Sequence, residues 1–208
     1  MKNNITEIVF IIDKSGSMAG FEDDTIGGFN SVIAEHKDGE GKVYVSTVLF
    51  SNEFYILHDR KNIADIERMT RNDFRVGGCT ALYDTISAMI CHIGNIHKYA
   101  RPEDIPDRTL FFIMTDGMEN ASVHCDLASV KSKIERQREK YGWDFIFLVA
   151  NIDTFETARS MGIKTEHAVR FEQTSEGMDS CFDDIMCIMR KVRKNEALDE
   201  INWTCEKK

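Results

Sequence analysis

Residues 8–18 read IVFIIDKSGSM, and this stretch decides the fold of the chain. Five apolar residues at positions 8–12 run without a break and stop at Asp13. An unbroken apolar run rich in Ile and Val is typical of a strand that is covered on both faces. The abrupt change to Asp, Ser and Gly predicts that the strand ends there, at the carboxyl edge of a sheet. We expect Gly16 to let the following loop fold tightly.

Oxygen-bearing side chains occupy alternate positions in this loop, at Asp13, Ser15 and Ser17. One carboxylate and two hydroxyls are ligand types that a hard cation such as Mg2+ prefers. The same residue types are also common in ordinary turns and helix caps. The metal interpretation therefore depends on whether other strand ends supply further ligands.

The rest of the chain alternates between strand and helix patterns. Apolar periodicity predicts, in chain order, a helix at 24–37, strands at 43–50 and 53–58, a short helix at 63–69, a helix at 82–96, a strand at 109–114, a helix at 127–141, a strand at 144–151, a short helix at 155–161, a strand at 167–172 and a helix at 175–193. We expect Asp23 or Asp24 to cap the first of these helices.

Such alternation indicates an α/β fold: a doubly wound, mostly parallel sheet of about six strands with helices on both faces. Only two residues separate the strands at 43–50 and 53–58, so these strands must pair antiparallel, and the second is the one antiparallel edge strand. No repeat or low-complexity linker interrupts the pattern. We expect one Rossmann-like domain over residues 1–195 and a polar C-terminal tail over 196–208.

Composition limits the class of protein. The chain has 208 residues, of which 42% are hydrophobic and 29% charged, which suits a buried core. Its formal net charge of −9 argues against a nucleic-acid surface, which needs a basic stripe. No apolar run approaches the length of a membrane span, and the first ten residues lack a signal-peptide pattern, so we expect a cytoplasmic protein. The six cysteines are scattered without a C-x-x-C pair, which favours reduced thiols.

Two later segments supply further ligands. The pair Gly77-Gly78 indicates a loop with unusual backbone angles, and Thr80 lies where this loop ends and a helix begins. Thr80 could cap that helix, offer its hydroxyl to a metal, or do both. Asp116 comes just after the apolar strand at 109–114 and is itself followed by glycine, which repeats the arrangement at the end of the first strand.

Doubly wound sheets bind ligands outside the carboxyl ends of their strands, where the strand order reverses. Two carboxylates and three hydroxyls can meet there, and they suit Mg2+ (or Mn2+). The candidate ligands include no Cys or His, and this disfavours a softer metal. The candidate metal ligands are Asp13, Ser15, Ser17, Thr80 and Asp116.

Three segments of the chain resemble those of a von Willebrand factor type A (VWA) domain: DKSGSM at 13–18, GGCTALYD at 77–84 and MTDG at 114–117. In that family their combination is the metal-ion-dependent adhesion site. The resemblance covers roughly residues 5–193 in element order and includes all the candidate ligands. It is nearest to stand-alone bacterial proteins of this kind, among them those of tellurite-resistance and related stress or phage-linked gene clusters.

The resemblance implies a protein–protein interaction module. Ser15 and Ser17 would bind the cation directly, and Thr80, Asp116 and Asp13 would bind it directly or through water. An open coordination position would accept an Asp or Glu carboxylate from a partner protein. In the family, ligand binding is linked to movement of the last helix, which corresponds here to 175–193.

A Mg2+-dependent phosphatase or hydrolase is the alternative, because aspartates at strand ends can serve phosphoryl transfer. The sequence lacks an acid two residues after Asp13, a G-x-S-x-G elbow around Ser15 or Ser17, and a P-loop lysine motif. We therefore expect a binding module without catalytic residues, with no nucleic-acid or membrane partner. The sequence does not indicate the oligomeric state.

Overall fold

The strand β1 (Ile5–Asp13) lies at the centre of a six-stranded sheet, as its apolar run predicts. The computed structural model describes residues 3–39, 41–150, 153–194 and 196. In the sheet the strand order is β3-β2-β1-β4-β5-β6. The other strands are β2 (Lys42–Phe50), β3 (Phe54–Asn62), β4 (Arg108–Thr115), β5 (Asp144–Val149) and β6 (Ala168–Arg170).

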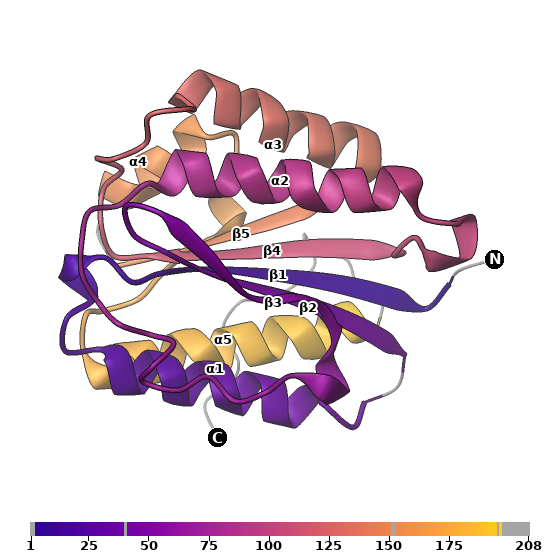
Figure 1. Ribbon diagram of the computed structural model, residues 1–208, viewed down its shortest axis with the longest axis horizontal. Coiled ribbons are helices and arrows are strands. Elements are labelled where there is room, and N and C mark those ends of the chain that lie inside the picture. The colour runs from indigo at the N-terminus through magenta and orange to yellow at the C-terminus, as the bar shows by residue number, and fades with distance from the viewer. Residues whose placement is uncertain (1–2, 40, 151–152, 195, 197–208) are drawn as a thin grey trace.

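Helices cover both faces of the sheet (Figure 1). One face carries α1 (Glu22–His36) and α5 (Ser175–Arg193), and the other carries α2 (Leu82–Tyr99), α3 (Leu127–Tyr141) and α4 (Asp153–Ser160). Successive residues of β1 point to opposite faces, so Phe10 enters the core under α1 and α5 while Val9 and Ile11 enter the core under α2 and α3. Both faces of β1 are therefore apolar, and this explains the unbroken run in the sequence.

The expected fold class is confirmed. Strand β1 pairs in parallel with β2 and β4, and β4 and β5 continue the parallel pairing to β6. Among the described strands, only the edge strand β3 is antiparallel, and it pairs with β2 across a short turn. This topology brings the carboxyl ends of β1 and β4 side by side, and α2 begins beside them.

Some expected elements differ from the structure. The expected helix at 63–69 is wrong, because only one 3-10 turn (Ile63–Asp65) forms there. The Asn30 side chain on α1 exchanges two hydrogen bonds with the backbone of Met69, at 2.9 and 3.0 Å, and so holds this segment in a non-helical conformation. The expected cap of α1 is also wrong: Phe21 is the N-cap, and the acidic residues expected there lie in the first turn.

Four cysteines are free thiols: Cys79, Cys91, Cys125 and Cys181. Cys187 on α5 is disulfide-bonded, so the expectation that all cysteines are reduced is wrong for this residue. The expected tail at 196–208 lies outside the described residues except for Glu196. No helix among the described residues is long and apolar enough to cross a membrane.

Candidate metal site

The ends of β1 and β4 place the first carboxylate. Ile12 pairs with Met114, so Asp13 lies beside the end of β4, where the Thr115 hydroxyl donates a 2.6 Å hydrogen bond to its Oδ2. The backbone N–H of Ser15 donates to Oδ1 of the same carboxylate at 2.7 Å. Both oxygens of Asp13 are thus oriented by the two strand ends.

The two serines extend from Asp13 toward Asp116. The Ser15 and Ser17 hydroxyl oxygens are 3.1 Å apart, and the Ser17 hydroxyl donates to Asp116 Oδ1 at 2.7 Å. Ser15 is buried, whereas Ser17 is exposed. The cluster therefore begins in the protein interior and opens to solvent at Ser17.

The loop before α2 brings Thr80 to the same place. Backbone hydrogen bonds from Gly77 N to Lys14 O (2.9 Å) and from Gly16 N to Gly78 O (3.0 Å) join this loop to the one after β1. Gly78 has a φ of +86°, and a Cβ there would lie 2.1 Å from Asn52 Oδ1, so only glycine fits. The expected unusual backbone angles of the loop are confirmed.

Gly16, by contrast, does not need the freedom of glycine. It has no positive φ, and a Cβ on it would lie at an ordinary 3.5 Å from Gly78 O. The expectation that Gly16 permits the tight loop is therefore wrong.

Gly117 marks the point that three of the candidate ligands share. A Cβ on this residue would lie 3.1 Å from Thr80 Oγ1, 3.2 Å from Ser17 Oγ and 3.9 Å from Asp13 Oδ2. Three oxygens from two segments, the end of β1 with its loop and the loop before α2, therefore face one small space beside the Gly117 backbone. All five residues expected from the sequence belong to this one cluster.

Thr80 does not cap α2, which excludes the simplest alternative for it. The N-cap is Ala81, and the N–H of Tyr83 is satisfied instead by the Glu119 carboxylate at 2.9 Å. Asn120 holds the Thr80 backbone, accepting from its N–H at 2.8 Å and donating to its C=O at 3.1 Å. The Thr80 side chain is thus positioned by its neighbours and not by a capping bond.

Sequence reasoning missed several supporting residues. Gln173, just before α5, donates to Asp116 Oδ2 at 2.8 Å, and Thr115, Glu119 and Asn120 support Asp13 and Thr80 as described. Thr115, Glu119 and Asn120 could have been identified, because they lie within or close to the motif at 114–117. Gln173 has no such signal, because it is 57 residues from Asp116 in the chain.

Burial controls the charge of the cluster. Asp13 and Asp116 are 0% and 6% exposed, and desolvation raises the pKa of each carboxyl above its usual value. Hydrogen bonds from Thr115 and Ser15 to Asp13, and from Ser17 and Gln173 to Asp116, lower the pKa in part. Among the described residues, neither carboxylate forms an ion pair with a cationic side chain.

This donor set fits a hard divalent cation. A bound cation would favour the ionised form of two carboxylates that burial otherwise disfavours. Three neutral hydroxyls and two carboxylates match the ligand types of Mg2+ or Mn2+. The part of the chain that the structure describes has no cluster of three or more His, Cys, Asp or Glu residues that could hold a metal. The candidate site itself contains two such residues, and its other donors are hydroxyls.

No protein-family model and no curated protein matches the sequence. Among solved structures, the chain is similar to proximal thread matrix protein 1 from the mussel byssus, with 14% identity over 88% of this chain and 45% of that chain and a TM-score of 0.59. A structure of that protein with a zinc-occupied MIDAS motif is similar at 14% identity over 87% of this chain and 44% of that one, with a TM-score of 0.59. The ArnB paralog VWA2 from Sulfolobus acidocaldarius is similar at 15% identity, 88% and 45% coverage and a TM-score of 0.55.

These likenesses show that the chain has a VWA, Rossmann-like fold. The chain spans less than half of the length of these three solved structures.

Proposed function

We propose that this chain is a divalent-metal-dependent protein–protein interaction module. In this proposal Ser15 and Ser17 bind the cation directly, Thr80 and Asp116 bind it directly or through water, and Asp13 binds it or holds its waters. A partner protein supplies an Asp or Glu carboxylate to the remaining coordination position.

The observation that carries the proposal is the convergence beside Gly117. The Thr80 hydroxyl from the loop before α2, and the Ser17 hydroxyl and Asp13 carboxylate from the end of β1, face one small space. Two buried carboxylates without a cationic partner among the described residues add a local need for positive charge. Mg2+ or Mn2+ supplies that charge, and its role when bound is to attract and orient an anionic group.

Charge also favours a carboxylate as the partner group. Two carboxylates and three neutral hydroxyls leave a divalent ion electrophilic, so the site attracts an anion although the chain has a net charge of −9. The loops 14–22, 77–80 and 117–122 form the rim of the site. Met118 and Val123, which are 58% and 81% exposed, add apolar surface near it for a partner to cover.

The Gln173 bond to Asp116 supports a link between the site and the last helix. Gln173 lies directly before the N-cap of α5, Thr174, so a change in how Asp116 is bound can act on the start of α5. We propose that partner binding is coupled to a shift of this helix.

The proposal includes the absence of catalysis. The Ser15 hydroxyl contacts another hydroxyl, and the Ser17 hydroxyl donates to a carboxylate, so the described contacts give neither serine a histidine base. No observation favours the alternative of a Mg2+-dependent phosphatase or hydrolase. A cytoplasmic, bacterial complex of a stress-response, tellurite-resistance or phage-linked kind remains the proposed setting, on the resemblance of the three motifs alone.

Affinity capture with quantitative mass spectrometry tests the proposal. Immobilised wild-type protein, Thr80→Ala and Thr80→Ser are compared in Mg2+ and in EDTA. A true partner should be retained by wild type and Thr80→Ser in Mg2+ only. The essential carboxylate of that partner is then located by Asp→Asn and Glu→Gln substitutions. Retention that is equal in all metal and variant combinations contradicts the proposal.

A further inference from the structure

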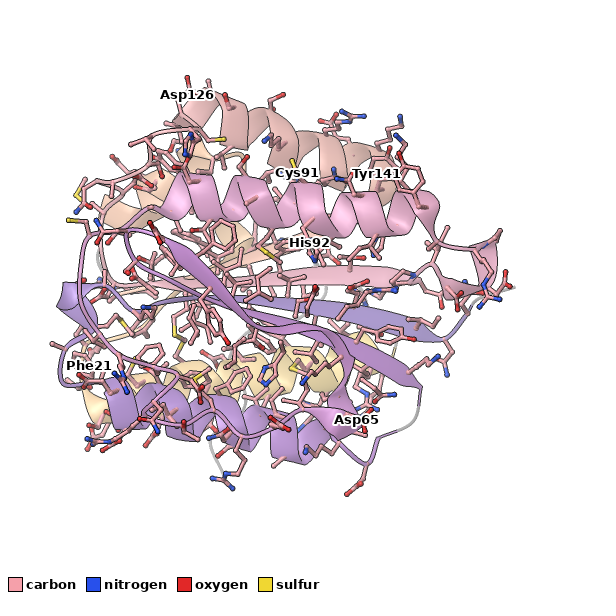
Figure 2. The ribbon with its side chains drawn as sticks, in the orientation of Figure 1. Phe21, Asp65, Cys91, His92, Asp126 and Tyr141 are labelled. Carbon is pink, nitrogen blue, oxygen red and sulfur yellow. The ribbon has the colours of Figure 1, made fainter. Side chains whose placement is uncertain are left out.

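A second site lies at the opposite end of the sheet from the candidate metal site. A pocket of about 580 Å³ opens between the last halves of α2 and α3, beside the start of β4. Figure 2 labels Cys91 on α2 and Tyr141 at the end of α3, two of the residues that line it. Pockets of this size commonly hold small organic ligands.

The charge of the pocket is opposite to that of the chain. Lys98, Lys133 and Arg136 line it, and Asp107 is its only acidic lining residue. None of these three cations forms an ion pair in the described part of the chain, although the Lys133 ammonium donates a hydrogen bond to Ser87 Oγ and the Lys98 ammonium lies 5.1 Å from the centre of the Tyr99 ring. The Asp107 carboxylate accepts the backbone N–H groups of Asn3 and Ile5, at 3.0 and 3.2 Å, which partly compensates its charge. An acidic protein thus presents a pocket that favours an anion.

Flat rings form one wall of the pocket. The Trp143 ring stacks on Phe111 at 5.4 Å and meets the His97 ring nearly perpendicularly, also at 5.4 Å. His97 is fixed in turn, because its Nε2 lies 2.7 Å from an oxygen of Glu7, which is fully buried and also paired with Arg60. This aromatic wall is therefore preorganised, and it suits the face or edge of another ring.

Gly94, in the middle of α2, keeps the pocket open. A Cβ there would lie 3.8 Å from Gln137 Nε2 and 3.9 Å from Trp143 Cη2, so a longer side chain would extend between α2 and the aromatic wall. A glycine inside a helix costs about 1 kcal/mol relative to alanine. The helix thus carries a glycine at a position that lines the pocket.

We propose that this pocket binds a small organic anion built on a planar ring, the chemistry that mononucleotides and aromatic carboxylates share. The anionic group would contact Lys98, Lys133 or Arg136, and the ring would pack against Trp143 and Tyr141. The inference does not depend on the proposed metal site, which lies at the other edge of the sheet.

Calorimetric titration tests the ligand class. AMP and 2-naphthoate represent the two sources, while adenosine and inorganic phosphate each lack one half of the recognised chemistry. If the ligand is a mononucleotide, AMP should bind more tightly than both adenosine and phosphate. If it is an aromatic carboxylate, 2-naphthoate should bind and phosphate should not. No binding of either anion, or binding of phosphate as tight as that of AMP, overturns the proposal.

Matched variants locate the binding. Gly94→Leu should abolish it, while Gly27→Leu, at a helical glycine of α1 with open space around it, should not. Arg136→Gln should weaken it by about tenfold, as expected for one charge-assisted contact. Lys140→Gln, on the same helix but outside the pocket lining, should leave it unchanged. In a Trp203→Phe background, bound AMP should also change the fluorescence of Trp143. Undiminished affinity in Gly94→Leu, with its fold verified by circular dichroism, overturns the proposal.

Discussion

The Ser17 hydroxyl donates a 2.7 Å hydrogen bond to Oδ1 of Asp116, although the two residues are 99 positions apart in the chain. This bond joins the loop after β1 to the loop after β4, and it is made by two of the proposed metal ligands. It is possible because β1 and β4 are neighbours whose carboxyl ends are level. The sheet order thus places the two halves of the site within reach of one cation.

Removing either carboxylate should remove the response to metal. Wild type should melt at a higher temperature in Mg2+ or Mn2+ than in EDTA, because a ligand at 100 times its Kd stabilises a protein by about 2.7 kcal/mol. Asp13→Asn and Asp116→Asn should show no such difference in scanning calorimetry. Asp126→Asn, at the N-cap of α3, is the control and should keep the full response. An equal response of Asp13→Asn and wild type would contradict the assignment.

Filling the space beside Gly117 should block the metal without unfolding the protein. In Gly117→Ala the new Cβ would lie 3.1 Å from Thr80 Oγ1 and 3.2 Å from Ser17 Oγ, where it crowds two proposed ligands. We expect metal affinity, measured by calorimetric titration, to fall by about tenfold or more, as for a lost contact to a charged group. Gly16→Ala, in a neighbouring loop with an ordinary 3.5 Å contact, should bind metal as wild type does. Identical affinities of Gly117→Ala and wild type would place the metal elsewhere.

Thr80→Ala should separate metal binding from stability. Thr80 is 2% exposed and does not cap α2, so its truncation removes one buried methyl group and one hydroxyl but no cap. We expect the free energy of unfolding in urea with EDTA to fall by about 1 kcal/mol, the scale of one buried methyl group. The stabilisation by Mg2+ should be lost, while Thr80→Ser should retain it. Full metal stabilisation of Thr80→Ala would exclude this hydroxyl from the site.

The contribution of His36 to stability in EDTA should be lost as the pH drops below about 6.5. His36 is buried under α5, and burial lowers its pKa below the usual 6.5, with Glu35 raising it and Arg193 lowering it further. Below pH 6.5 the unfolded chain therefore takes up a proton that the folded protein does not. This stabilisation is complete above the pKa that His36 has in the unfolded chain. As the pH falls toward the lower pKa of His36 in the folded protein, the stabilisation is lost by at most about 1.4 kcal/mol per pH unit.

Replacing the ring should reduce this dependence. In His36→Leu the slope of unfolding free energy against pH should decrease between pH 6.5 and the folded pKa, while His124→Gln, at an exposed histidine, should not change it. Part of the slope should remain, since burial also lowers the pKa of His58. A slope that is identical in His36→Leu and wild type would assign the effect to other groups.

The protein should not hydrolyse phosphoesters. With p-nitrophenyl phosphate and Mg2+ or Mn2+, the rate should equal that of Asp116→Asn and of buffer alone, because the described contacts give Ser15 and Ser17 no base. Turnover by wild type that disappears in Asp116→Asn would establish the hydrolase alternative.

Much of the fold and all five cluster residues could be predicted from the sequence, because they depend on local patterns. An apolar run followed by Asp, Ser and Gly indicates a buried strand and its loop wherever it occurs. The non-helical segment near Met69 could not be predicted, since it is held by Asn30 from a different helix. The same holds for Gln173 and for the pocket around Gly94, which depend on residues brought together only by the folded chain.

The edges of the sheet bear on aggregation. At one edge, β6 has only three residues, Ala168–Arg170. At the other, β3 pairs with β2 in a register that shifts near its middle, and Arg60 has a left-handed φ of +47° that a regular strand does not allow. A short edge and an irregular, charged edge each present a poor template for an incoming strand. Two copies of this protein therefore have little opportunity to join their sheets into one.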